Sequence, residues 1–210
     1  MPRVVACLYV LAVAASAQAR PSVEIALPPA AQARTLGPSV RARAVLRDAR
    51  TQELLEAGFP ARLHFRVELW SEGGWVNDLE GSAEWDVVLR YLPFEKLWEV
   101  VQVVNGRPLS LGRFARFDDA ERASERPVRA EVRPVRARRA MYYQAVLTVE
   151  SLSVSDLDEL DRWLRGELLP AVRLQRNPGT ALSRGVRQLT ARLLGGDRRE
   201  YAVRSERFGA

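Results

Sequence analysis

Apolar and polar residues alternate with a period of two along several stretches of the chain, which is typical of β-strands that bury one face. The clearest stretch covers residues 61–71, where Leu63, Phe65, Val67 and Leu69 share one face opposite a row of charged side chains. Four further stretches alternate in the same way: residues 39–48, 83–92, 141–152 and 199–208. The pattern therefore predicts a protein built mainly from strands.

Two sequence signals predict how these strands are connected. The Asn-Gly pair at 105–106 predicts a tight hairpin between residues 97–104 and 107–114, because both central positions of such a turn favour positive φ. A short helix is predicted to begin at Thr51, its expected cap, and to end at Gly58.

Four acidic residues between positions 156 and 161 open a predicted helix rather than a metal site. Ser153 or Ser155 can cap this helix, and Pro170 ends it. Its apolar stripe consists of Leu157, Leu160, Leu164 and Leu168. The carboxylates fan around the helix, and the stretch lacks the central glycine of a calcium loop. A second amphipathic helix is predicted over residues 180–194.

Six or seven antiparallel strands need a second apolar layer to cover their buried face. The sequence thus predicts a mainly β fold, an antiparallel β-sandwich of the Ig-like or C2-like kind. A short helix is expected after the first strand, and one or two amphipathic helices near the C-terminus. The expected divisions are a signal peptide at 1–19, a Pro/Ala-rich leader at 20–38, the sandwich domain with its closing helix at 39–170, and a basic helix and tail at 171–210.

The N-terminus has the three parts of a secretory signal peptide. Arg3 precedes an apolar run that reaches about Ala15, and small residues follow at Ala17 and Ala19. The single cysteine, Cys7, lies inside the apolar run rather than after it, which argues against a lipoprotein. No later stretch is apolar for the roughly 20 residues that a membrane-spanning helix needs. We therefore expect an exported protein of the periplasm or cell envelope.

Basic residues cluster in two parts of a chain whose net charge is +6. Residues 126–139, an expected edge strand or loop, hold six arginines, and residues 184–207 hold seven. Trp70 and Trp75 flank a Gly-Gly loop and could stack on a ligand. The candidate binding surface consists of Arg129, Arg133, Arg136, Arg138, Arg139, Arg184, Arg187, Arg192, Trp70 and Trp75. The expected partner is an envelope protein or an anionic surface and not a nucleic acid, although simple solvation of these arginines is the alternative.

Groups for catalysis are few. His64 is the only histidine and lies on the charged face of its predicted strand. The carboxylates that folding could bring together for glycoside cleavage are Glu68, Glu84, Asp86 and Glu99. No catalytic residue, cofactor or metal site is predicted.

Three motifs, "LLEAGFPARLHFRVELW", "RYLPFEKLWEV" and "SVSDLDELDRWLRGE", resemble the exported bacterial family of unknown function DUF4390 over roughly residues 40–170. The resemblance implies an envelope location and no established activity. We therefore expect a non-catalytic binding or interaction module. The alternatives are a carboxylate-based hydrolase and a peripheral membrane protein that uses its basic C-terminal helix. The sequence leaves the oligomeric state open.

Overall fold

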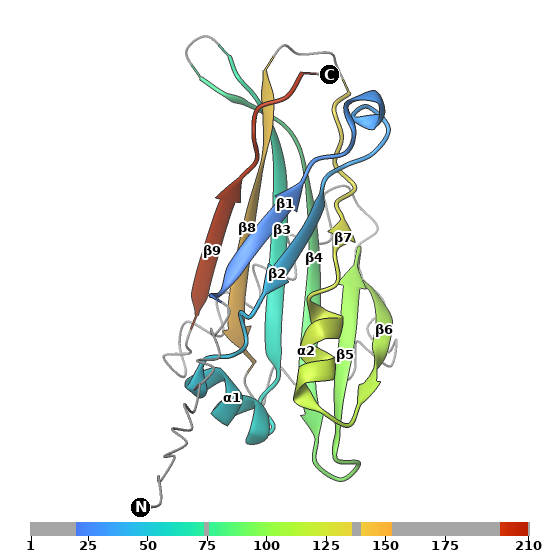
Figure 1. The fold of residues 1–210 in the computed structure, drawn as a ribbon, viewed down its shortest axis with the longest axis vertical. Helices are drawn as coiled ribbons and strands as arrows, with labels where there is room; N and C mark the ends of the chain where they lie inside the picture. Colours follow the sequence, from blue (N-terminus) through green and yellow to red (C-terminus); the bar gives the residue numbers. More distant parts are fainter. Residues whose placement is uncertain (1–19, 74–75, 136–139, 153–197, 210) are drawn as a thin grey trace, which may run out of the picture.

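The computed structural model describes residues 20–73, 76–135, 140–152 and 198–209 (Figure 1). Its elements in chain order are β1 (Ser22–Ala26), a 3-10 helix (Ala30–Gln32), β2 (Ser39–Arg43), α1 (Ala49–Glu56), β3 (Ala61–Ser71), β4 (Asp78–Leu92), β5 (Leu97–Val104), β6 (Arg107–Phe114), α2 (Phe117–Ser124), β7 (Val128–Arg129), β8 (Met141–Ser151) and β9 (Arg199–Arg204). The described strands form two antiparallel sheets. The prediction of a mainly β fold is confirmed.

The larger sheet has the strand order β6-β5-β4-β3-β8-β9, so four consecutive strands from β3 to β6 form a meander. The alternation predicted for β3 is confirmed, because Leu63, Phe65, Val67 and Leu69 are all buried in the core. Their neighbours in β4 and β8 face the same way and are buried with them. Side chains of successive residues point to opposite faces of a strand, so the charged residues of β3 share the other face.

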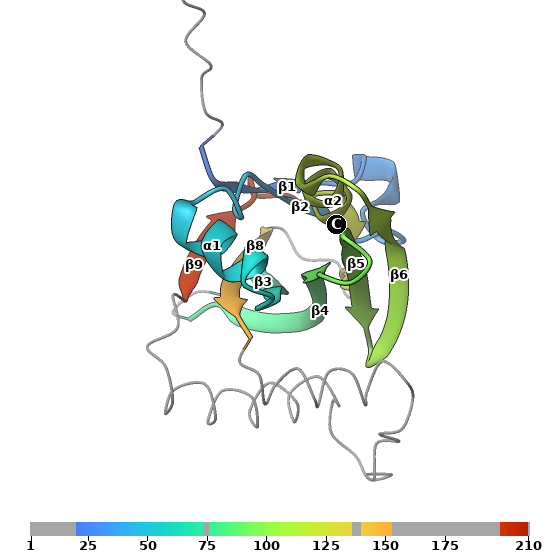
Figure 2. The same ribbon diagram turned by 90° about the horizontal axis from the view of Figure 1, so that it is seen from below.

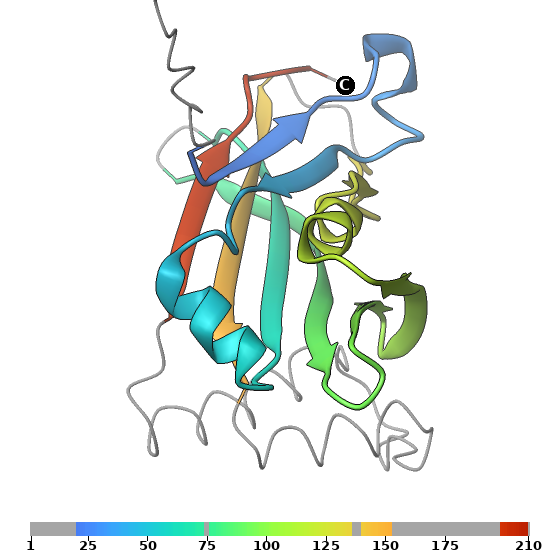
Figure 3. The ribbon, with the colours of Figure 1, turned by 60° about the horizontal axis from the view of Figure 1, so that its bottom comes forward.

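The smaller sheet, with the order β1-β2-β7, covers the inner face of the larger sheet together with both described helices (Figures 2 and 3). One hydrophobic core joins the two layers. Val40 and Ala42 of β2 and Ala120 of α2 belong to it, as does Leu147 of β8. We call the opposite side of the six-stranded sheet, which carries Arg62 and His64, the outer face.

The N-terminal part of the fold differs from the prediction in three places. Residues 22–26 lie in the expected leader but form β1, which pairs with β2 along its whole length. β2 ends at Arg43 instead of continuing to residue 48, since Ala44 adopts a positive φ of 52° and turns the chain away. The cap of α1 is Asp48 rather than Thr51, because the Asp48 side chain accepts a hydrogen bond from the Thr51 backbone N–H at 2.9 Å.

Later elements follow the predicted pattern more closely. Asn105 and Gly106 have φ values of 52° and 75°, which confirms the tight β5–β6 hairpin. The predicted terminal strand is present as β9, paired with β8. Helix α2 was not predicted, because its buried face consists mainly of small alanine and serine side chains. The helices predicted over residues 153–170 and 180–194 lie outside the described residues.

Candidate functional site

The residues after α2 form an extended segment along one edge of the smaller sheet. Only Val128 and Arg129 are assigned to β7, which pairs with β2. The alternation nevertheless continues from 129 to 135, with Ala130, Val132 and Pro134 buried and the residues between them exposed. Figure 1 shows this segment running beside the loop that carries the 3-10 helix.

Specific backbone contacts hold the segment in place. The Ala130 N–H donates to the Pro38 carbonyl at 2.9 Å, and the Tyr143 hydroxyl donates to the Val132 carbonyl at 3.2 Å. Gly37 permits this close approach, because a Cβ at that position would lie 2.0 Å from the Ala130 carbonyl oxygen. Burial raises the pKa of Tyr143 to about 12, so its hydroxyl keeps its proton and remains a donor. The segment is therefore a fixed part of the fold.

Four arginines on or beside this segment have no carboxylate partner among the residues that the structure describes. Arg126, Arg129 and Arg133 are exposed along the segment itself. Arg34 is exposed on the neighbouring loop, which Arg133 reaches by donating to the Thr35 carbonyl at 3.3 Å. We call these four residues the arginine edge. Many of the other described arginines are held in ion pairs, including those of β2, β3, β4 and α2.

The structure divides the predicted binding surface. Arg129 and Arg133 lie together on the arginine edge, as expected from the basic cluster. Trp70 instead lies on the outer face of the larger sheet, where its indole N–H donates to Glu68 at 3.0 Å, so it does not join them. The remaining predicted residues lie outside the described residues: Trp75, Arg136, Arg138, Arg139, Arg184, Arg187 and Arg192.

Two further arginines of the edge were absent from the predicted surface. Arg126 belongs to the same basic cluster and could have been included on that signal alone. Arg34 is nearly a hundred residues from Arg133 in the chain, and only the pairing of β2 with β7 brings them together.

The outer face of the larger sheet carries a second cluster, built from ion pairs between neighbouring strands. Arg62 of β3 donates to Asp86 of β4 at 2.9 Å and to Glu150 of β8 at 3.1 Å. His64 lies directly opposite Asp86, and its Nδ1 is 2.8 Å from the same carboxylate.

The environment of Asp86 keeps its carboxylate ionised. Burial opposes ionisation, but the hydrogen bond from His64 and the charge of Arg62 outweigh it and lower the pKa of Asp86. An ionised Asp86 accepts the proton on Nδ1 of His64, which fixes the orientation of the imidazole. The cluster thus behaves as a set of cross-strand ion pairs with complementary charges.

The four carboxylates considered for glycoside cleavage do share this outer face. Each lies within ion-pair distance of a basic residue: Glu68 and Glu84 of Arg66, Asp86 of Arg62, and Glu99 of Arg90 and Arg113. A general acid for glycoside cleavage needs a raised pKa, whereas a nearby cation favours the ionised form. Asp86, whose pKa is lowered, therefore does not supply the acid.

A raised pKa does occur at Glu121 of α2, in the opposite layer. Burial raises the pKa of Glu121 more than the hydrogen bond from Arg47 lowers it. Its side chain is almost completely buried against Arg47, so it offers no access to a substrate. Glu121 therefore has a structural role in the packing of α2.

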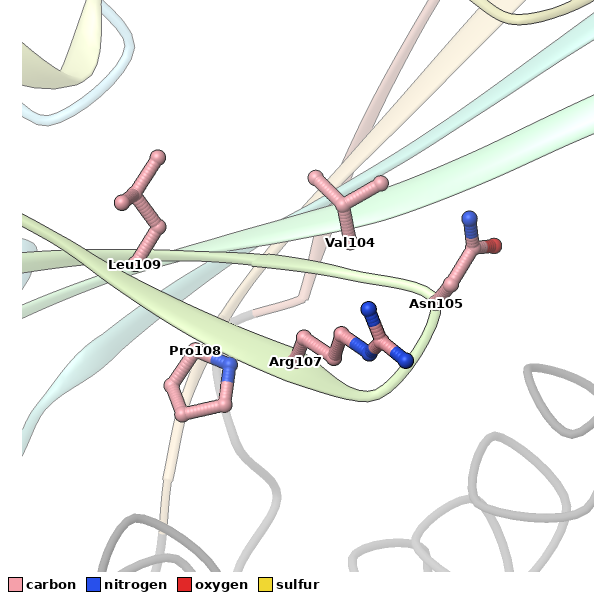
Figure 4. Close-up of a pocket in the computed structure, with 5 residues that line it drawn as sticks. All are labelled: Val104, Asn105, Arg107, Pro108 and Leu109. Carbon is pink, nitrogen blue, oxygen red and sulfur yellow. The ribbon is translucent and has the colours of Figure 1, made fainter.

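A shallow hollow of about 560 Å³ lies beside the tip of the β5–β6 hairpin (Figure 4). Its lining consists of Val104, Asn105, Arg107, Pro108 and Leu109. These five residues include one charged side chain and no carboxylate, histidine or hydroxyl, so they provide no acid–base pair.

Two kinds of feature are absent from the described part of the chain. No group of three His, Cys, Asp or Glu side chains there is arranged to hold a metal ion. No helix within the same ranges is long and apolar enough to cross a membrane.

Comparison of the chain with protein-family models, with curated proteins and with solved structures finds no match. The resemblance to DUF4390 stays a prediction.

Proposed function

We propose that this protein is an exported, non-catalytic binding module of the cell envelope whose arginine edge binds an acidic surface on a partner protein. The location rests on the signal-peptide pattern of residues 1–19. We also propose that the two antiparallel sheets form a sandwich of the Ig-like or C2-like kind, in agreement with their shared core.

The observation that carries the proposal is the set of unpaired arginines. Among the described residues, Arg34, Arg126 and Arg129 are exposed without a carboxylate partner and lie close together, while many other exposed arginines, such as Arg47, Arg113 and Arg116, pair with nearby acids. A guanidinium presents several donors in a planar fork that matches a carboxylate. Unpaired guanidinium groups on a fixed backbone are therefore ready to bind carboxylates of another molecule.

Other features of the segment favour a protein over a uniform polyanion or lipid surface. Glu131 lies between Arg129 and Arg133, where it would repel a continuous negative charge. Val135 is also strongly exposed at the end of the segment and adds an apolar contact. A mixture of basic, acidic and apolar groups is typical of protein interfaces.

A direct test uses the chain without its signal peptide and a fluorescent poly-L-glutamate as the acidic probe. We expect the triple variant Arg126→Ala, Arg129→Ala, Arg133→Ala to bind the probe at least tenfold more weakly at low salt, because carboxylate contacts are lost. The matched control changes three exposed but ion-paired arginines: Arg50→Ala, Arg116→Ala and Arg122→Ala. It removes the same net charge and should weaken binding less than threefold.

The same variants show whether the negative charge that the arginine edge binds belongs to a protein or to a membrane. A benzoylphenylalanine at position 135, introduced in cells that make this protein, should cross-link to one dominant envelope protein, and the triple variant should lose that product. Equal losses of poly-L-glutamate binding in both triple variants would contradict the proposal, because net charge alone would then explain it. Binding to phosphatidylglycerol vesicles without a protein cross-link would instead support a membrane surface.

A further inference from the structure

The smaller sheet has a solvent face on the side away from the core. Val40 and Ala42 of β2 are buried in the core, so Arg41 and Arg43, which alternate with them, point to the opposite side. Figures 2 and 3 show no described element over this side of the sheet. The solvent face of β2 is therefore basic and open.

The strand register joins this face to the arginine edge. Ser39 of β2 lies directly opposite Arg129 of β7, and Arg41 lies directly opposite Glu24 of β1. Residues that lie directly opposite each other in an antiparallel pair have their side chains on the same face. Arg129 therefore shares the solvent face with Arg41, which is two residues beyond Ser39, so the arginine edge continues onto β2.

A single carboxylate, Glu24, serves both arginines of β2. Its Oε2 accepts a hydrogen bond from Nε of Arg41 at 2.6 Å, and its Oε1 lies 2.9 Å from Nε of Arg43. The hydrogen bond from Arg41 lowers the pKa of Glu24, so this carboxylate is ionised at neutral pH. Each guanidinium has five N–H donors, so both arginines keep donors that Glu24 does not use.

The ion pairs of Glu24 are easily exchanged. The exposed fractions of the three side chains lie between 37% and 45%, and ion pairs at such exposed sites contribute little to stability. A carboxylate of another molecule can form the same charge-assisted hydrogen bonds with Arg41 and Arg43. If that molecule is already held at Arg129, its other carboxylates reach β2 at a high effective concentration. Displacing Glu24 then requires little additional affinity.

We propose that the acidic partner of the arginine edge extends over the solvent face of the smaller sheet, where its carboxylates replace Glu24 on Arg41 and Arg43. Glu24 is then an internal competitor, which weakens the binding of any segment with too few carboxylates to displace it. This inference rests on the proposed function of the arginine edge. The occupant is the same partner protein, because the two surfaces are continuous and carry the same sign of charge.

Removing the competitor should strengthen binding of fluorescent poly-L-glutamate to the chain without its signal peptide. We expect Glu24→Gln to bind this probe at least about fivefold more tightly at low salt, because Arg41 and Arg43 are freed. The matched control is Glu53→Gln, which makes the same change in net charge at the exposed pair with Arg50 and should tighten binding less than about twofold. In a chain that also carries Arg41→Ala and Arg43→Ala, Glu24→Gln should give no gain, since it then frees no guanidinium.

A cross-link on the solvent face separates this inference from the proposed function. Benzoylphenylalanine at position 39, introduced in cells that make this protein, should cross-link to the same envelope protein as position 135. Equal effects of Glu24→Gln and Glu53→Gln would overturn the inference, as would a partner product at position 135 with none at position 39. Both results leave the proposed function of the arginine edge intact. Products at position 39 that join two copies of the chain would also overturn the inference, whereas the absence of a partner product at both positions would contradict the proposed function itself.

Discussion

At the scale of single residues, the outer face of the larger sheet is organised by pairing across strands. Arg62 lies opposite Val88 on one side and Glu150 on the other, and it reaches diagonally to Asp86. One guanidinium thus joins β3, β4 and β8. Both ion pairs have largely buried side chains, so removing one partner leaves the other charge buried without an opposite charge beside it.

Asp86→Asn should lower the free energy of unfolding by about 1–3 kcal/mol at pH 7, because the buried Arg62 and His64 lose the negative charge of their shared acceptor. The folded pKa of Asp86 lies below its unfolded value of 3.8, so the native chain gains stability above that pH and loses it as the pH falls through the folded pKa. The difference between variant and native chain should therefore shrink below about pH 4 in urea unfolding experiments.

Glu95→Gln is the matched control for this variant, because Glu95 pairs with Arg113 at an exposed site. We expect its effect to stay below about 0.5 kcal/mol. An Asp86→Asn effect that does not vary with pH would show that the hydrogen-bond geometry, and not the charge, stabilises the cluster.

At the scale of elements, Gly37 decides how closely the arginine edge approaches β2. A methyl group at this position would lie 2.0 Å from the Ala130 oxygen and 2.7 Å from the Val132 oxygen, and both are backbone atoms. Gly37→Ala should lower the free energy of unfolding by about 1–3 kcal/mol and speed hydrogen exchange at the Ala130 amide. Gly81→Ala is the control, because its Cβ would meet only the Val132 side-chain methyl at 3.2 Å. Equal effects of the two substitutions would contradict a backbone clash at Gly37.

The sequence predicts elements well where one residue type repeats at a fixed spacing. The alternation of large apolar residues identified β3, β4 and β8, and Asn105 and Gly106 identified the β5–β6 hairpin. β1 was missed because prolines and alanines around it resemble a loose leader, and its strand depends on pairing with β2. α2 was missed because alanines provide little hydrophobic contrast.

The candidate site was predictable only in part for a related reason. The local cluster of arginines pointed to Arg129 and Arg133, but charge along the chain does not show which arginines find a carboxylate across strands. The register of β3 against β4 and β8 decides that question for Arg62. Trp70 lies on a different surface from Arg129 and Arg133, and its position in the chain alone did not show which face of the sheet it occupies.

At the scale of the whole molecule, the end of the chain returns to the main sheet. β9 pairs with β8 from Arg199 to Arg204, and the Phe208 backbone makes two hydrogen bonds with Met141. The Phe208 ring stacks on Tyr143 with centroids 5.1 Å apart. Arg199 also forms an ion pair with Asp48, the cap of α1, at 2.6 Å. The C-terminal residues therefore hold the two layers together and are more than a basic tail.

Truncation after Pro170 should consequently destabilise the fold and not merely remove a binding surface. It exposes the long edge of β8 and uncovers the Tyr143 ring, and uncovering an apolar side chain of this size costs about 1.5–3 kcal/mol. We expect the truncated chain to unfold at a clearly lower urea concentration, as measured by tryptophan fluorescence. We also expect it to aggregate through the open edge of β8. A chain that ends at Gly209 keeps β9 and Phe208 and should match the full-length protein. If the chain truncated after Pro170 kept its urea midpoint, β9 would be dispensable for the stability of the fold.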